Sequence, residues 1–457
     1  MEEKYTCSRN VSAVFWGICF FLIFWQGFLV IRNASCQTDS RHYFTLDRAI
    51  QQALSSNLGL KSAQEDIRAA MARKNSRRTE FFPTFNLTYQ YLRNDDDLNV
   101  TEFGTIRPQN EYSWRAKFTQ PVFTGFSILN RFKISEMALQ ASKAGEQAFR
   151  QDLIFSTMDA YFSLLKAIKL WEIAQETIAE IESQREVAEN YYEVGITPLN
   201  DLLQVEVELA NARQLLIISQ NNLQTAEAFF NTLLRRPINA PIYVDDIIYY
   251  EPFEYDIEYC FSEAEKNRHE LDIADLNLQI AEKEFEIAKK DFFPRITLEG
   301  QYLQQGPDWD ASGGLGIFGE SSSWTVTAVA TWNFFEWGRT YYGAEEQLYR
   351  ASQARLEKNQ LLDNIRLEVK ESYLKMRESE KNIKAVEVAI KQAEENFRIF
   401  TEQYKEQMAT QTDVLIAQTL LSRTRINYYN ALYEYEIAKA GLYRAMGGLD
   451  SMEKPNR

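Results

Sequence analysis

The chain has 457 residues, and its 65 Asp and Glu outnumber its 50 Lys and Arg, which gives a formal net charge of −15. Its 18 glycines and 10 prolines are few: they form about 6% of the chain, against roughly 12% in average proteins. With 45% hydrophobic residues, this argues against a disordered, collagen-like or loop-rich all-β protein. The acidity argues against nucleic-acid binding, and two histidines and four scattered cysteines predict no metal site and no cofactor.

Residues 1–36 have the pattern of an export signal: basic residues precede an apolar run over residues 11–31, and small residues follow it. That run is also close to the length of a membrane span, so an uncleaved N-terminal anchor stays an alternative. In a lipoprotein interpretation Cys36 becomes the lipidated first residue, although Asn33 stands where such signals normally have Leu. A disulfide between Cys36 and Cys260 is the one pairing left after signal removal.

The rest of the chain contains one unit twice. Phe81-Phe82-Pro83 recurs 211 residues later as Phe292-Phe293-Pro294, and Asp201 is matched by Asp413, 212 residues on. Such self-similarity is the sequence signature of a repeated structural unit. We therefore predict a first repeat over residues 37–240, a linker over 237–255 that contains prolines and tyrosines, a second repeat over 253–448 and a tail over 449–457.

Each repeat contains two runs in which apolar and polar residues alternate, which is the pattern of a strand with one apolar face. Each run has about 9–11 residues, the length of a strand that crosses a membrane. A half-buried strand of a soluble sandwich has the same period, but the matched lengths, the export signal and the lack of another sheet favour a membrane barrel. The strands are predicted over residues 84–93, 112–123, 295–303 and 323–334.

Four strands cannot close a barrel, and an open sheet edge is not tolerated in lipid. We therefore predict a barrel shared between chains, to which three chains would supply twelve strands. The connections within the strand pairs, residues 94–110 and 304–322, are polar or rich in glycine, as expected on the extracellular side.

A helix precedes each strand pair, over residues 46–79 and 262–291, and a long helical hairpin follows each pair, over residues 126–235 and 338–445. Residues 126–190 contain no proline and one glycine, which is enough chain for a helix of about 100 Å. Ile154, Met158 and Tyr161 follow the spacing of a coiled-coil seam, so lateral packing must stabilise such helices. Gln407 stands in the second turn where Gly195 stands in the first.

Several short motifs occur in a fixed order: Leu46, Ala49, Ala53-Leu54 and Asn57; Phe81-Phe82-Pro83; Gln120-Pro121-Val122-Phe123; Tyr192-Glu193-Val194-Gly195 with Asp201-Leu202-Leu203; and Tyr404, Asp413-Val414-Leu415 and Ala445-Met446-Gly447. Over about residues 42–448 this order resembles the TolC family of bacterial outer-membrane efflux channels. The resemblance implies a homotrimer in the outer membrane of a Gram-negative bacterium, whose 12-stranded barrel continues as a periplasmic α-helical coiled-coil tube. It also implies contact with lipid and, as partners, a periplasmic adaptor protein and an inner-membrane RND or ABC transporter.

In that family the turn of the second repeat narrows the pore with aspartate rings and a network centred on a tyrosine. By resemblance Asp413 matches one ring position, Tyr404 matches the tyrosine, and Asp201 is the first-repeat equivalent of Asp413. The other ring position falls on Ile416, and the arginine that partners the tyrosine falls on Ala409. From the residues alone, Asp413 and Asp201 can also simply cap their helices, and Tyr404 can be a packed aromatic.

The two turns are also where the resemblance implies contact with the adaptor. The residues expected there are Gly195, Thr197 and Pro198 in the first turn, and Met408 and Thr410 in the second.

The function that these features favour is a passive exit duct for an efflux pump or a type I secretion system, since the chain has no nucleotide-binding loop. An elongated structural or adhesive coiled-coil protein without a pore would explain the helices but not the duplicated strands. An enzyme is a third class, for which Glu263, His269 and Glu270 are the candidate group. Because such charges are typical of a solvated helix face, we predict no catalysis.

Overall fold

The structure is a computed structural model that describes residues 43–100, 104–245, 251–315 and 320–449. The chain divides into two units, Met1–Tyr43 and Phe44–Arg457, and all described residues except Tyr43 belong to the second. The predicted export signal and Cys36 therefore lie outside the described residues. Within the described ranges, no helix combines the length and apolar character needed to cross a membrane.

Two helices placed end to end precede each strand pair, where the sequence pattern predicted one helix. Helices α2 (Leu46–Ser56) and α3 (Leu58–Thr79) meet at Asn57, and α6 (Ile257–Asn267) and α7 (His269–Ala288) meet at Arg268. Both joints have extended backbone, and they lie 211 residues apart, as the repeat requires. The Asn57 side chain accepts a hydrogen bond from the N–H of Leu60 and so caps α3, a role that asparagine favours over a helix interior.

The joint at Arg268 makes tertiary contacts. Its side chain is only 5% exposed, and its guanidinium group lies 3.0 Å from the Glu368 carboxylate and 3.1 Å from the carbonyl oxygen of Ala445. Arg444 extends this group of charges by pairing with Asp152 and Glu368. The extended backbone at Arg268 places its guanidinium group among these partners, where its charge is satisfied.

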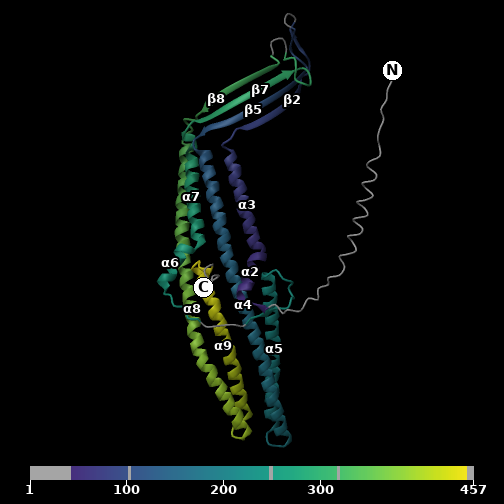
Figure 1. Cartoon of the computed structure of the whole chain (residues 1–457), viewed down its shortest axis with the longest axis vertical. Helices are drawn as coiled ribbons and strands as arrows, with labels where there is room; N and C mark the ends of the chain where they lie inside the picture. Colours follow the sequence, from purple (N-terminus) through teal and green to yellow (C-terminus); the bar gives the residue numbers. More distant parts are fainter. Residues whose placement is uncertain (1–42, 101–103, 246–250, 316–319, 450–457) are drawn as a thin grey trace, which may run out of the picture. The chain divides into compact units, whose positions relative to one another are not determined.

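The strands form one antiparallel sheet in the order β2-β5-β7-β8 (Figure 1). The strands are β2 (Thr84–Arg93), β5 (Asn110–Thr124), β7 (Arg295–Gly306) and β8 (Ser322–Thr331). Phe85 pairs with Phe118, which pairs with Gly300, and this row belongs to the apolar face. Gly300 is required there, because a Cβ atom would lie 2.0 Å from the Phe118 ring.

Two details of the strands differ from the sequence pattern. Strand β8 ends at Thr331, three residues before the predicted end, and residues 332–336 are irregular. The connection over residues 94–110 contains a small hairpin of its own, made by β3 (Leu98–Val100) and β4 (Gly104–Arg107).

The hairpins consist of α4 (Ser127–Glu193) with α5 (Leu199–Leu233) and α8 (Arg339–Lys405) with α9 (Gln411–Ala445). Helices α3 and α7 flank the halves of α4 and α8 that adjoin the sheet, and α5 and α9 flank their other halves (Figure 1). The neighbours in the upper half follow the order α3-α4-α7-α8, which is the order of the strands that they join.

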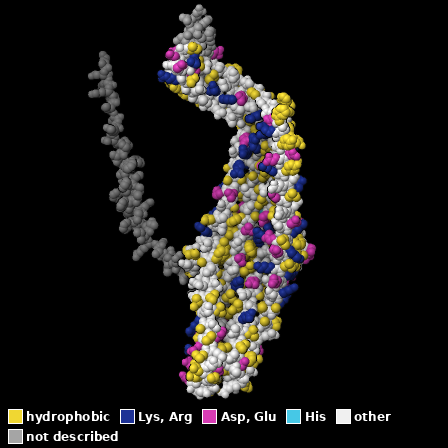
Figure 2. Space-filling model, turned by 180° about the vertical axis from the view of Figure 1, so that it is seen from behind, with side chains coloured by type: hydrophobic (Ala, Val, Ile, Leu, Met, Phe, Trp, Pro, Cys, Tyr) yellow, Lys and Arg dark blue, Asp and Glu magenta, His cyan; other side chains and the backbone are white. Residues whose placement is uncertain are grey.

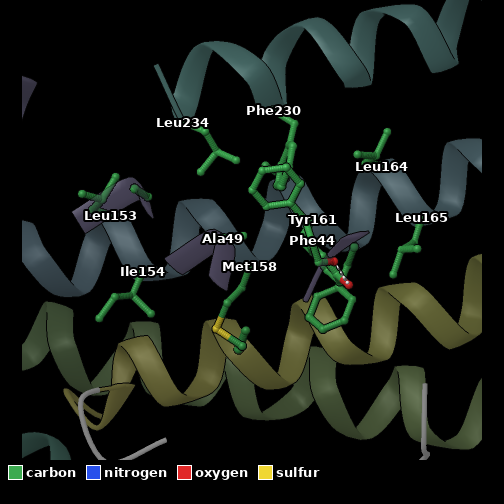
Figure 3. Packing of buried hydrophobic residues seen from close by; sticks show 14 of the residues in the cluster. Phe44, Ala49, Leu153, Ile154, Met158, Tyr161, Leu164, Leu165, Phe230 and Leu234 are labelled. Atoms are coloured by element: carbon green, nitrogen blue, oxygen red, sulfur yellow. Dashed lines mark hydrogen bonds between the residues drawn. The ribbon is translucent and has the colours of Figure 1, made fainter. Parts of the chain in front are cut away.

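The largest apolar cluster lies where α2, α4, α5 and α9 meet (Figure 3). Phe230 points from α5 toward α4 and packs edge-to-face on Phe44, with 6.1 Å between the ring centroids. The hydroxyl of Tyr161 lies 2.7 Å from the carbonyl oxygen of Asp245 and 3.1 Å from that of Phe44. Tyr161 therefore fixes two distant segments, the entry to the first repeat and the start of the linker, onto α4.

Cys260, the possible disulfide partner of Cys36, is a free thiol in a second apolar cluster between α6, α8 and α9. Burial raises the pKa of this thiol to about 11, so it is protonated and unreactive at neutral pH.

We predict that Tyr161→Phe lowers the free energy of unfolding by about 1 kcal/mol, because it removes the hydroxyl that donates a hydrogen bond to the carbonyl oxygen of Asp245. Thermal unfolding of the purified protein measures the loss. Tyr192→Phe is the matched control, since Tyr192 is exposed and its hydroxyl makes no hydrogen bond to a described residue. Equal melting temperatures for the two variants would contradict the anchoring role of Tyr161.

Candidate functional site

Both hairpins turn through the same backbone motif. In the first turn the N–H of Ile196 donates to the carbonyl oxygen of Tyr191 (2.8 Å), and in the second the N–H of Met408 donates to that of Gln403 (2.8 Å). Each bond closes a Schellman motif, which satisfies carbonyl groups that the end of a helix leaves unpaired. The two turns are therefore structural equivalents, at the ends of the hairpins far from the sheet (Figure 1).

This motif needs one residue in the left-handed backbone region. Gly195 occupies that position in the first turn with φ 74°, and Gln407 occupies it in the second with φ 61°. Glycine adopts this conformation without strain, whereas a side chain with a Cβ atom is disfavoured there. The second turn is therefore the more strained of the two.

Asp413 caps α9. Its Oδ2 atom accepts hydrogen bonds from the N–H of Thr410 (2.9 Å) and from the Thr410 hydroxyl (2.7 Å), while its own N–H donates to the Thr410 Oγ1 (3.2 Å). These bonds form a reciprocal capping box, and they lower the pKa of Asp413. In a single chain, Asp413 thus caps α9. Its Oδ1 atom makes no hydrogen bond to any described residue.

Tyr404, at the end of α8, is 7% exposed and packs on Tyr191 of α4 with 5.6 Å between ring centroids. Its buried hydroxyl has no hydrogen-bond partner among the described residues. Burial, and after it the charge of Asp201, raises the pKa of Tyr404 to about 12. Asp201 is thus near enough to act on Tyr404 through its charge, but the two form no hydrogen bond, and position 409 holds Ala409 instead of an arginine.

The other turn residues fall at or beside the helix starts. Pro198 is the N-cap residue of α5, and the Thr197 hydroxyl is buried without a partner among the described residues. Thr410 is the N-cap of α9. Met408 is 73% exposed, and Ile416 is exposed as well.

Sequence reasoning missed a polar seam between α9 and α4. Gln411 and Gln418 are each 1% exposed, and the Gln418 amide donates to Glu180 of α4. Arg425 lies 3.2 Å from the same carboxylate. Gln411, Gln418 and Arg425 are spaced by seven residues, so a search for polar residues at heptad positions would have found them.

The residues considered as a catalytic group each have a charged neighbour. Glu263 pairs with Lys266 (3.3 Å), His269 lies 3.4 Å from Asp272, and Glu270 pairs with the buried Arg268 (3.0 Å). In the described part of the chain, no three or more His, Cys, Asp or Glu side chains are grouped so that they could hold a metal ion.

Comparison with known sequences decides the family. The model of the family described as "Outer membrane efflux protein" matches residues 49–234 and 260–448, which are parts of both repeats. The chain belongs to the outer membrane efflux protein family. This confirms the resemblance to the TolC family, and it decides against a structural protein without a pore.

Relatives of this outer membrane efflux protein match it along most of their length. It is 23% identical over 430 residues to the outer membrane protein TolC of Escherichia coli, covering 89% of this chain and 83% of that protein. It is 23% identical over 425 residues to the outer membrane protein OprJ of Pseudomonas aeruginosa, covering 88% and 84%. The protein is thus an efflux channel of the Gram-negative outer membrane with an extended periplasmic part.

Solved structures have the same fold. The Campylobacter jejuni CmeC outer membrane channel aligns with a TM-score of 0.78 at 16% identity, covering 88% of this chain and 85% of that chain. The outer membrane protein VceC of Vibrio cholerae aligns with a TM-score of 0.76 at 18% identity, covering 88% and 96%.

We predict that Gln407→Gly stabilises the second turn by about 0.5–1 kcal/mol, because relief of left-handed strain exceeds the entropy that glycine loses on folding. Gly195→Gln is the reciprocal change and destabilises the first turn by a similar amount. Hydrogen exchange of the Met408 and Ile196 amides measures both effects. Faster exchange at Met408 in Gln407→Gly would contradict the argument.

A second prediction concerns pH. Since the folded-state pKa of Asp413 is lowered, its cap is intact above the unfolded pKa of about 3.9 and is lost as pH falls through the folded value. Amide exchange in the first turn of α9 therefore accelerates in acid, relative to the intrinsic rate. In Asp413→Asn this acceleration is absent, and an unchanged acid response in that variant would rule out the cap as its cause.

Proposed function

We propose that three copies of this chain form one barrel of twelve strands that continues into a helical tube, and that the assembly is the passive exit duct of a tripartite efflux pump or a type I secretion system. The observation that carries the proposal is the sheet itself. Its apolar face presents exposed Phe85, Leu87 and Trp324, and the outer edges of strands β2 and β8 have no partner among the described strands. Such a sheet fits a bilayer only after other copies have closed it.

The energy for transport comes from partners in this proposal. An inner-membrane RND or ABC transporter drives the substrate, and a periplasmic adaptor connects it to the two hairpin turns. Gly195, Thr197 and Pro198 form one contact surface, and Met408 and Thr410 form the other. The high exposure of Met408 supports this role, because an apolar side chain on an open turn is suited to a partner.

The gate lies at the same end of the tube. Three Asp413 carboxylates around a narrow axis attract cations and repel one another. The capping box uses one oxygen atom of each carboxylate and leaves the other available to face the pore. The packing of Tyr404 on Tyr191 holds the second hairpin against the first beside Asp201, without the arginine that the family resemblance would place at position 409.

Two further parts of the proposal concern chemistry. The duct catalyses no reaction, which the charged neighbours of Glu263, His269 and Glu270 support. Cys36, if it becomes the first residue, carries a lipid, and the mass of the mature N-terminal peptide tests this.

Conductance in a planar bilayer tests the duct and its gate together. We expect small, cation-selective channels, and we expect Asp413→Asn to reduce the cation selectivity while its amide still accepts the Thr410 hydrogen bond. Glu406→Gln is the matched control, because Glu406 is an exposed acid of the same turn. Folded protein without conductance would refute the duct, and equal effects of the two variants would refute the Asp413 ring.

A further inference from the structure

A groove of about 620 Å³, bordered by arginines, runs across helices α3, α4, α7 and α8 near the ends that adjoin the sheet. Arg73 and Arg77 of α3 line one side, Arg350 of α8 lines the other, and Arg131 of α4 lines the end near the strands. The floor between them is apolar and includes the half-buried Ile134 and Ile287. Four arginines thus surround an apolar floor, and Glu284 is the one acidic side chain in the lining.

The groove lies on the polar side of the sheet. A neighbouring pocket of about 550 Å³ shares Arg131 with it and reaches Thr84 and Thr119. These two threonines pair with each other in the sheet, on the face opposite Phe85 and Phe118, because successive residues of a strand point to opposite sides. When the apolar face is turned to lipid, the groove therefore faces the interior of the barrel and tube.

The arginines of the groove are incompletely neutralised. Arg77 and Arg131 share a single carboxylate, that of Glu80, at 2.5 Å and 3.0 Å. Burial acts to raise the pKa of Glu80, but the hydrogen bonds from these two arginines outweigh it and lower the pKa. Arg350 pairs with Glu346 (2.5 Å), and Arg73 makes no ion pair with any described residue.

This positive charge stands out against the composition of the chain, whose net charge is −15. Figure 2 shows that Lys and Arg side chains gather over the end of the helices that adjoins the sheet, on the face displayed there. A guanidinium group matches the geometry of carboxylate, sulfonate and phosphate oxygens, and an apolar floor favours a ligand with an apolar body.

We propose that this groove binds amphiphilic organic anions, molecules with an apolar ring or chain and one acidic group, on the inner wall of the duct. The lumenal position rests on the proposed function, whereas the binding chemistry rests on the groove alone. The duct then has two charged zones in series: arginines below the barrel and acidic side chains at the far turns.

Binding of two fluorescent probes to the purified full-length protein in lipid nanodiscs tests the proposal. Pyrene-1-sulfonate and 1-pyrenemethylammonium share an apolar ring and differ in charge. We expect saturable sulfonate binding, at least tenfold tighter than that of the ammonium probe. Arg73→Glu combined with Arg350→Glu should weaken sulfonate binding at least tenfold.

The matched control is Arg78→Glu combined with Arg355→Glu, which changes the same charge on the same two helices outside the groove lining. Both arginines are exposed, and this variant should bind the sulfonate within twofold of the wild type. Equal weakening in both variants would show a general effect of charge and overturn the groove as the site. So would equal affinity for the two probes.

Bilayer conductance of the same preparations separates this proposal from the duct itself. Conducting channels without a sulfonate preference would overturn the groove and leave the duct intact. A sulfonate preference that depends on Arg73 and Arg350, in protein that does not conduct, would support the binding site and overturn its place in a duct.

Discussion

Strands β2 and β8 each present a row of backbone N–H and C=O groups that no other strand of the described chain pairs. In water such an edge is a liability, and in lipid each unpaired group costs several kcal/mol. The apolar face of the same sheet carries large exposed side chains such as Phe85 and Trp324, which favour lipid over water. These two properties of the sheet support the proposal that further copies of the chain complete it in a membrane.

The order of the helices follows the order of the strands in this sheet. Because α3, α4, α7 and α8 follow the order of the strands that they join, closing the sheet into a barrel also closes the helices into a tube. The side of the wall that continues the polar face of the sheet becomes the lining. In the proposed assembly, this constraint on backbone hydrogen bonds would turn Arg73, Arg131 and Arg350 toward the interior of the tube.

Local signals made much of the fold readable in the sequence. Pro83 and Pro294 end helices and precede strands, and the alternation after each proline marks the strand. The break at Arg268 was not readable, because this buried arginine pairs with Glu368, 100 residues away in the sequence. The alternation of apolar and polar residues did not predict the early end of β8 or the small hairpin of β3 and β4.

The sequence predicted where the two turns lie, but not which contacts their side chains make. The repeat located both turns, and Asp413 with Thr410 has the spacing of a capping box. The burial of Tyr404 against Tyr191 and the polar seam of Gln411, Gln418 and Arg425 arise from packing between hairpins distant in sequence. Such contacts appear only when the two hairpins are placed side by side.

Disulfide trapping between the two sheet edges tests the shared barrel most directly. A cysteine at Thr325 on β8 is combined in turn with one at Asn86, Thr88 or Gln90 on β2, with each single-cysteine parent as the control. Within one chain these edges are three strand spacings apart, about 14 Å, too far for a disulfide. The account predicts that at least one pair yields covalent species of up to three chains on a denaturing gel. Monomer alone from all three pairs, in protein inserted into membranes, would contradict it.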